Sequence, residues 1–218
     1  MGFSVAIDGP AGAGKSTIAR LVAEEKGFIY VDTGALYRAL GVHFMEQGID
    51  LSKEDEIVAA CVGVHVDIKH VAGVQQVFLN GKNVTEQLRD EAVGKVASAT
   101  ASIFQVRQTL LAVQRNLAKE KDVVMDGRDI GTEILPDANV KIFLTASVTV
   151  RAARRYEELK KQGMACDINK IEEDIKARDL QDTKRAVAPL RQAEDAILID
   201  SSDLTIEQVV AEIVRYIK

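Results

Sequence analysis

The sequence predicts an α/β fold in which a parallel sheet of five strands is covered by helices. Short apolar runs at residues 3–8, 28–31, 123–126, 140–144 and 196–200 have the length and composition of buried strands. Segments with helical periodicity lie between them, and this alternation favours a parallel sheet with helices on its faces. A glycine-rich loop directly after the first run indicates where a ligand binds.

That loop, at residues 9–16, reads G-P-A-G-A-G-K-S and fits the phosphate-binding pattern G-x-x-x-x-G-K-[ST]. An apolar strand precedes it and a helical pattern at 17–25 follows, which is the context that the motif requires. Backbone N–H groups of such a loop surround phosphate oxygens, Lys15 reaches the β- and γ-phosphates, and the Ser16 hydroxyl ligates Mg²⁺. The full motif makes a ligand-free glycine turn a weak alternative. The predicted triphosphate-binding residues are Gly9, Pro10, Ala11, Gly12, Ala13, Gly14, Lys15, Ser16 and Thr17.

The composition narrows the class of protein. The chain has 218 residues, 47% of them hydrophobic, and a net charge of −5, so no overall basic field favours a nucleic-acid partner. Cys61 and Cys166 are isolated, which suits free thiols in a reducing cytoplasm. Neither a signal sequence nor a membrane-spanning run is expected, and we expect a cytoplasmic monomer without a membrane partner.

The second strand, at 28–31, leads into D-T-G-A-L-Y-R at 32–38, where a helix begins. Ligands of such folds sit at the carboxyl ends of the strands, which places Thr33 and Arg38 near the phosphate loop. Thr33 could equally be only a helix N-cap. Residues 50–62 read as a short acidic helix.

Residues 63–95 change to the alternating pattern of antiparallel strands, with Asn80-Gly81 as a two-residue hairpin turn. We interpret this segment as a small insert, and His65 and His70 in it as exposed strand residues rather than metal ligands. Residues 91–119 read as helical with an interruption at Gly94. Their predicted core face is Ala97, Ala101, Phe104, Leu110, Leu111 and Val113.

The third strand ends on Asp126 and runs into the polar loop 127–132, G-R-D-I-G-T, at the same edge as the phosphate loop. A turn with a surface ion pair is the alternative.

A helix rich in basic residues follows the fourth strand at 147–162, and residues 167–183 form a charged helix. The latter has a predicted apolar stripe of Ile168, Ile171, Ile175 and Leu180. Its polar face carries Arg178, Asp182 and Arg185, which could also be ordinary salt-bridge decoration. Thr205 and Gln208 predict a capping box for the last helix.

The predicted activity is phosphoryl transfer. No N-K-x-D run is present, which argues against a GTPase, and the chain is short for a motor. Arginines lie around the expected phosphate site, and guanidinium groups stabilise the charge of a transferred phosphoryl group without proton chemistry. The arginines concerned are Arg38, Arg107, Arg128, Arg154, Arg155, Arg178 and Arg185.

Four runs together resemble the bacterial cytidylate kinase family of nucleoside monophosphate kinases over almost the whole chain. They lie at residues 7–17, 32–38, 126–132 and 185–190. The resemblance implies a P-loop kinase with a five-stranded parallel sheet, a small antiparallel β insert that binds the monophosphate, and a helical lid. It implies a single domain over residues 1–218. Core regions would be 1–62, 96–146 and 186–218, the insert 63–95, and the lid with the acceptor-binding helices 147–185.

The resemblance also implies transfer from ATP to CMP or dCMP with Mg²⁺ as cofactor, held by Ser16 and, through water, by Asp126. Thr33, Ser98 and Asp182 would contact the cytosine, and Asp129 the ribose. The implied CMP-binding set is Thr33, Arg38, Ser98, Arg107, Arg128, Asp129, Arg178, Asp182 and Arg185. The implied catalytic set is Lys15, Arg128, Asp129, Arg154 and Arg155, the last two as lid residues over ATP.

A carboxylate at position 182 suits the amino group of cytosine, whereas uracil presents an acceptor there. Two positions depart from the family pattern: Thr33 stands where many relatives have Ser, and Gln181 where some have Arg. Two alternatives remain open. The chain could phosphorylate another nucleotide or a small metabolite, or it could bind nucleotides without catalysis.

Overall fold

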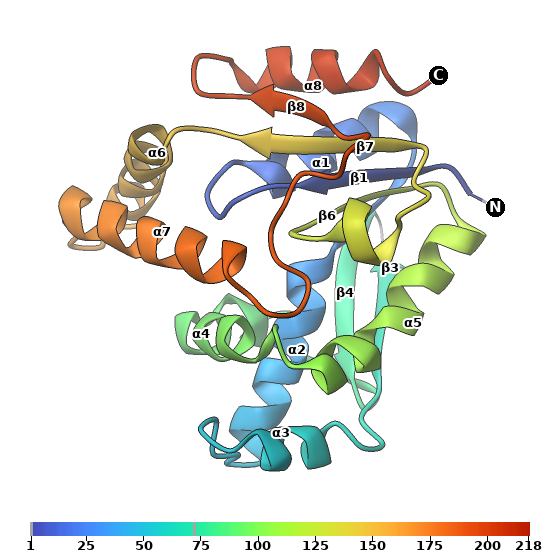
Figure 1. The fold of residues 1–218 in the computed structure, drawn as a ribbon, viewed down its shortest axis with the longest axis vertical. Helices are drawn as coiled ribbons and strands as arrows, with labels where there is room; N and C mark the ends of the chain where they lie inside the picture. Colours follow the sequence, from blue (N-terminus) through green and yellow to red (C-terminus); the bar gives the residue numbers. More distant parts are fainter. Residues whose placement is uncertain (1, 72) are drawn as a thin grey trace. The chain divides into compact units, whose positions relative to one another are not determined.

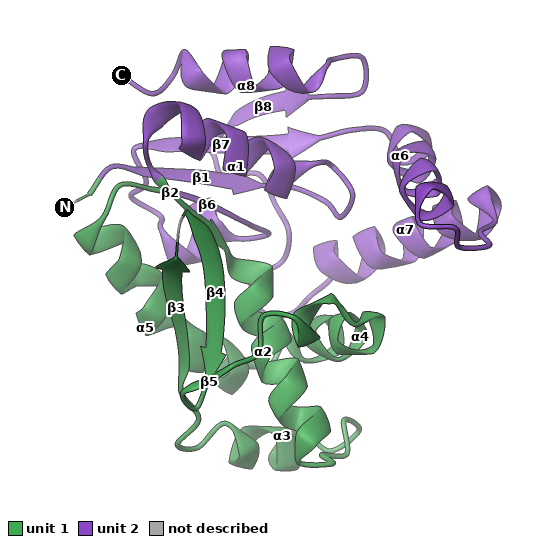
Figure 2. Ribbon diagram, turned by 180° about the vertical axis from the view of Figure 1, so that it is seen from behind, with its two compact units in different colours: residues 1–2, 29–123 green, residues 3–28, 124–218 purple. Residues whose placement is uncertain are grey.

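The computed structural model describes residues 2–71 and 73–218, and the chain divides into two compact units. The first unit comprises residues 1–2 and 29–123, and the second residues 3–28 and 124–218 (Figure 2). The predicted insert 63–95 lies wholly within the first unit, together with the flanking segments 29–62 and 96–123.

The elements alternate as the sequence predicts (Figure 1). The strands are β1 Ser4–Asp8, β2 Ile29–Asp32, β3 Val66–Val71, β4 Val74–Leu79, β5 Lys82–Asn83, β6 Val123–Gly127, β7 Val140–Thr145 and β8 Ile197–Asp200. The α-helices are α1 Lys15–Lys26, α2 Thr33–Glu46, α3 Glu54–Ala60, α4 Glu91–Thr100, α5 Phe104–Glu120, α6 Val148–Lys161, α7 Ile168–Thr183 and α8 Ile206–Val214. A 3₁₀ turn, η1, spans Gln87–Arg89 and a π-helical turn, η2, spans Ile130–Ile134.

The predicted five-stranded sheet is confirmed, with the order β2-β6-β1-β7-β8 and β1 at its centre. β1 pairs with β7 and β7 with β8 in parallel register. Every residue of β1 and of β6 is buried, which is why both read as continuous apolar runs rather than as alternating ones. The carboxyl ends of β1 and β6 lead into the loops that form the candidate site of the second unit.

Helix ends in the second unit follow local sequence signals. α1 ends at Gly27, whose φ of 67° is left-handed, and the N–H of Phe28 returns to the carbonyl of Ala23 at 2.8 Å. α8 begins with the predicted capping box, in which the N–H of Thr205 donates to Gln208 Oε1 at 2.8 Å and the N–H of Gln208 donates to Thr205 Oγ1 at 3.3 Å. The capping box therefore gives hydrogen-bond acceptors to the N–H groups of both Thr205 and Gln208 at the start of α8.

Replacing Thr205 with alanine is expected to lower the free energy of unfolding by about 1 kcal/mol, because the N–H of Gln208 loses its acceptor. Denaturant unfolding of the variant beside the wild type measures the change. Glu207→Ala is the control in the same turn. An unchanged midpoint for Thr205→Ala would contradict the stabilising role of the capping box.

The first unit packs α2, α4 and α5 with the antiparallel sheet β3-β4-β5 around one apolar cluster. The predicted hairpin is confirmed between β4 and β5, where Asn80 and Gly81 have φ values of 48° and 81°. His65 is exposed, as expected, while the ring of half-buried His70 contacts the carbonyl of Tyr30 at 2.9 Å. No helix within residues 2–71 and 73–218 is both long and apolar enough to cross a membrane.

Three details differ from the sequence-based expectation. The break in residues 91–119 falls between Thr100 and Phe104, and Gly94 lies inside α4. Phe104 opens α5 and is 62% exposed, so it does not belong to the core face. In α7 only Ile175 of the predicted stripe is fully buried, because the buried side of that helix carries Asp182 and the ends of the stripe face solvent.

Candidate active site

The phosphate-binding loop joins β1 to α1 with backbone angles that glycine supplies. Gly9, Gly12 and Gly14 have φ values of 150°, 75° and 86°. A Cβ at Gly9 would lie 1.9 Å from the carbonyl oxygen of Leu144, so no side chain fits at that position. The loop is held against β7, and its shape depends on glycine at the start of the motif.

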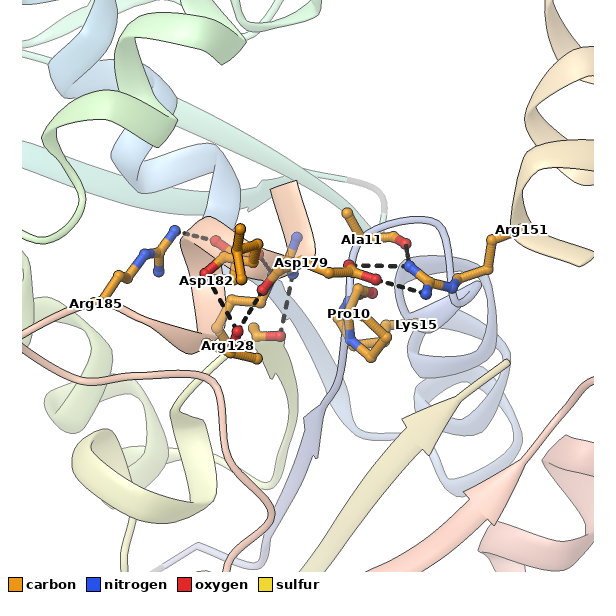
Figure 3. Close-up of polar contacts among 11 residues, drawn as sticks. Pro10, Ala11, Lys15, Arg128, Arg151, Asp179, Asp182 and Arg185 are labelled. Carbon is orange, nitrogen blue, oxygen red and sulfur yellow. Dashed lines mark hydrogen bonds and ion pairs between the residues drawn. The ribbon is translucent and has the colours of Figure 1, made fainter. Parts of the chain in front are cut away.

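Lys15 is the first residue of α1 and only 5% exposed. Its Nζ donates to the carbonyl oxygen of Pro10 at 2.7 Å (Figure 3). Burial lowers the pKa of Lys15 well below its usual range, and the positive charge of Arg128 lowers it further, against the carboxylates of Asp126, Asp8 and Asp182. An ammonium group desolvated in this way gains more from an incoming phosphate than an exposed one would.

Ser16 and Asp126 meet at the carboxyl ends of β1 and β6. The Ser16 hydroxyl donates to Asp126 Oδ2 at 2.9 Å. A hydroxyl and a carboxylate are hard oxygen ligands of the kind that Mg²⁺ prefers, with its remaining positions filled by water and phosphate oxygens, so these residues fit that ion. Within residues 2–71 and 73–218 no group of three or more His, Cys, Asp or Glu residues forms a metal site made of protein alone.

Arg128, Asp182 and Arg185 form a buried charge cluster. Arg128 Nε donates to Asp182 Oδ2 at 2.8 Å, and Arg185 Nη2 pairs with Asp182 Oδ1 (Figure 3). Asp182 is 1% exposed, and the Arg185 side chain 8%. The structure thus brings Arg128 to Asp182 and Arg185, although it lies far from them in the sequence. Because Asp182 and Arg185 are buried, their pairing is not an exposed surface salt bridge.

Arg151 and Asp179 form a second cluster that sequence reasoning missed. Arg151 Nη1 and Nη2 bind the Asp179 carboxylate at 3.0 and 2.6 Å, and Nη1 also donates to the carbonyl of Ala11 at 3.0 Å (Figure 3). Arg151 Nε donates to the carbonyl of Ala146 at 2.9 Å. This guanidinium group therefore connects α6, α7 and the phosphate loop, although the sequence shows Arg151 only as one of several basic residues of its helix.

The predicted lid arginines have other partners. Arg154 donates to the hydroxyl and carbonyl oxygens of Ser201 at 3.2 and 2.7 Å, and Arg155 pairs with Glu158 one turn along α6 at 2.8 Å. Arg178, on α7, is exposed. The partners of Arg154 and Arg155 lie outside the phosphate loop, so binding ATP through either of them requires its side chain to move.

Four of the predicted acceptor-site residues belong to the first unit, namely Thr33, Arg38, Ser98 and Arg107. Thr33 is 3% exposed at the first position of α2, whose N-cap is Asp32 rather than Thr33. Asp32 accepts the N–H of Ala35 at 3.0 Å and pairs with Arg38 at 2.8 Å. The N-cap alternative for Thr33 is therefore wrong, because Asp32 caps the helix one position earlier.

Ser98 and Arg107 lie on α4 and α5 of the same unit and are half-buried. The Arg107 guanidinium lies 5.9 Å from the centre of the Tyr37 ring, and its Nη1 donates to the carbonyl of Ala101 at 3.2 Å. Both contacts hold the arginine in a defined orientation.

Asp8 and Asp129 complete the second unit's site and are 4% exposed each. Asp8 is the last residue of β1, and its carboxylate accepts the N–H groups of Ile130 and Gly131 at 2.8 and 2.7 Å. Asp8 stands next to the motif in the sequence, but no role was predicted for it. The feature that could have indicated a role is a charged residue at the end of an otherwise apolar strand.

Comparison with known proteins identifies the family. A family model described as cytidylate kinase matches residues 5–218. Proteins named cytidylate kinase from Caldicellulosiruptor saccharolyticus, Alkaliphilus oremlandii and Bacillus velezensis are 49%, 48% and 46% identical. The alignments cover 98%, 98% and 99% of this chain and 94%, 97% and 96% of those proteins.

Solved structures share the fold at low sequence identity. An uncharacterized protein from Eubacterium ventriosum aligns with a TM-score of 0.53 and 16% identity over 100% of this chain and 98% of its own. A sugar kinase from Janibacter sp. aligns with a TM-score of 0.50 and 14% identity over 100% of this chain and 95% of its own. At these identities the likeness concerns the fold alone.

Proposed function

We propose that this chain, which belongs to the cytidylate kinase family, transfers the γ-phosphoryl group of ATP to CMP and dCMP, giving ADP with CDP or dCDP. The observation that carries the proposal is the pairing, within the second unit, of a complete phosphate-binding loop with the buried Arg128–Asp182–Arg185 cluster. The loop suits the donor triphosphate, and the arginines suit an acceptor that itself bears phosphate.

The proposed mechanism is direct in-line transfer. Backbone N–H groups of residues 9–16 and the Lys15 ammonium bind the β- and γ-phosphates. Ser16 and, through water, Asp126 would hold Mg²⁺, which when bound would supply positive charge against the phosphate oxygens. Arg128 and Arg185 align the acceptor phosphate, which is already nucleophilic, so no strong base is required.

The acceptor contacts are assigned residue by residue from the family resemblance. Thr33, Ser98 and Asp182 are proposed to contact the cytosine, Asp129 the ribose, and Arg38, Arg107 and Arg178 the rest of the acceptor. Both oxygens of Asp182 already accept from arginines, so a cytosine contact there would use their second lone pairs. We therefore assign Asp182 first to holding the arginines, and its contact with the base is a separate hypothesis.

An acceptor panel tests the proposal. We expect CMP and dCMP to be the best of CMP, dCMP, UMP, AMP and shikimate in a coupled assay of ADP release, with UMP lower by about tenfold or more because its O4 is an acceptor where cytosine has a donor. A higher kcat/KM with AMP or shikimate would indicate a kinase of another acceptor. ATP binding without ADP release for any acceptor would indicate a non-catalytic nucleotide-binding protein.

A further inference from the structure

Asp8 lies where two loops of the second unit leave neighbouring strands. It is the last residue of β1 and directly precedes Gly9 of the phosphate loop. Its two carboxylate oxygens each accept one backbone N–H, from Ile130 at 2.8 Å and from Gly131 at 2.7 Å. These two residues follow immediately on Arg128 and Asp129, so one side chain joins the donor loop to the loop that carries acceptor-site residues.

The contact with Asp8 leaves little freedom for the loop that carries Arg128 and Asp129. A Cβ at Gly131 would lie 3.2 and 3.3 Å from the side-chain carbons of Lys141 and 3.5 Å from Asp8 Oδ2. The Lys141 stem is itself fixed, because its Nζ binds both oxygens of Asp195 at 2.9 and 2.7 Å. The backbone at residues 130–131 is thus enclosed by the Asp8 carboxylate and the Lys141 stem.

The two N–H donors account for a carboxylate at this position, because each of them needs its own acceptor oxygen. Burial, the largest influence, raises the pKa of Asp8 to about 7, and the nearby Asp129 carboxylate raises it too, while the two N–H groups and Lys15 act against this. Because the folded-state pKa lies above the ordinary value of 3.8, the ionised form at neutral pH makes folding less favourable. An asparagine would avoid that cost, but it offers one acceptor oxygen in place of two, so one of the two N–H groups would face an amide NH₂ and lose its acceptor.

We propose that Asp8 is a positioning residue. Its carboxylate fixes the backbone after Asp129 and thereby holds Arg128 and Asp129 in the position from which they contact the acceptor. The carboxylate does not touch the reacting atoms. The inference rests on the proposed function for its kinetic readout, because acceptor turnover is what misplacement of the loop would lower.

The test compares Asp8→Asn and Asp8→Ala with the wild type. For Asp8→Asn we expect a lower unfolding midpoint, because one of the two N–H groups loses its acceptor. At temperatures where the variant is folded we expect a fall in kcat/KM for CMP of about tenfold or more and a KM for ATP within about twofold, since small misplacements in a catalytic site lower rates steeply. Asp8→Ala should lose about 100-fold. Asp90→Asn is the matched control, since Asp90 also accepts a backbone N–H, from Ala92 at 2.8 Å, as the N-cap of α4.

An NMR readout keeps the inference separate from the proposed function. In the wild type the amide resonances of Ile130 and Gly131 should shift together as the Asp8 carboxylate titrates, and this shared titration should disappear in Asp8→Asn. Absence of CMP turnover in the wild type would remove the proposed function while leaving this measurement intact. Identical Ile130 and Gly131 titrations in the wild type and Asp8→Asn, or an Asp8→Asn enzyme with wild-type kcat/KM for CMP, would overturn the inference.

Discussion

Replacing Lys15 with methionine is expected to lower kcat for CMP phosphorylation by about 10²–10³-fold, the range found when one preorganised charge-stabilising donor is removed. Methionine keeps most of the apolar stem and removes the ammonium, whose desolvation is the main reason that the pKa of Lys15 is lowered. The free energy of unfolding should therefore not fall, because the variant no longer buries a charge. The loss of activity would then be chemical rather than structural.

A second lysine of α1 provides the control for this experiment. Lys26, at the other end of the helix, is half-buried and donates to the carbonyl of Ile217 at 2.8 Å. Lys26→Met makes the same chemical change in the same helix and should retain kcat within about threefold, since it removes no phosphate ligand. ADP release at saturating ATP and CMP, with denaturant unfolding of each variant, gives both quantities. A Lys15→Met enzyme within tenfold of the wild type would contradict the assignment of Lys15 to the γ-phosphoryl group.

Much of the fold could be predicted because its signals are local. The strand ends, the phosphate loop, the stop at Gly27, the hairpin at Asn80-Gly81 and the capping box at Thr205 each depend on a few neighbouring residues. The break between α4 and α5, just before Phe104, could not be predicted because no glycine or proline marks it. The break was expected at Gly94 instead, but a glycine is tolerated inside α4.

Site residues that belong to a sequence motif could be predicted, whereas those brought into the site by tertiary contacts could not. Lys15, Ser16 and Asp126 follow from motif and strand position, and Ser16 and Asp126 lie within hydrogen-bond distance of each other. Their contacts with phosphate and Mg²⁺ stay predictions. Arg151 is one of several basic residues of its helix in the sequence, and its partners are Asp179, 28 residues later, and the carbonyl of Ala11. Asp8 meets its partners 122 and 123 residues along the chain, a distance over which sequence periodicity says nothing.

Replacing Asp182 with alanine is expected to lower the free energy of unfolding by about 3–5 kcal/mol, because Arg128 and Arg185 lose the carboxylate that both of them share. We expect kcat/KM for CMP to fall by about 100-fold, as the two guanidinium groups repel one another and leave the acceptor position. Asp182→Asn keeps the shape but halves the acceptor capacity toward the arginines, and should lie between the alanine variant and the wild type. Asp174→Asn, on the exposed part of α7, is the control for a charge change on the same helix.

The ratio of kcat/KM for CMP and UMP separates the two roles of Asp182. If the carboxylate only organises the arginines, both acceptors lose activity equally and the ratio stays constant, because the phosphate contacts are common to both. If it also accepts from the cytosine amino group, the preference for CMP falls by about tenfold or more, the worth of one hydrogen bond to a charged group. A variant that keeps wild-type stability and kcat/KM would contradict both roles. Since Asp182 is 1% exposed with an arginine on each oxygen, organisation of the arginines is the role that its burial favours, and the base contact is the smaller of the two expected effects.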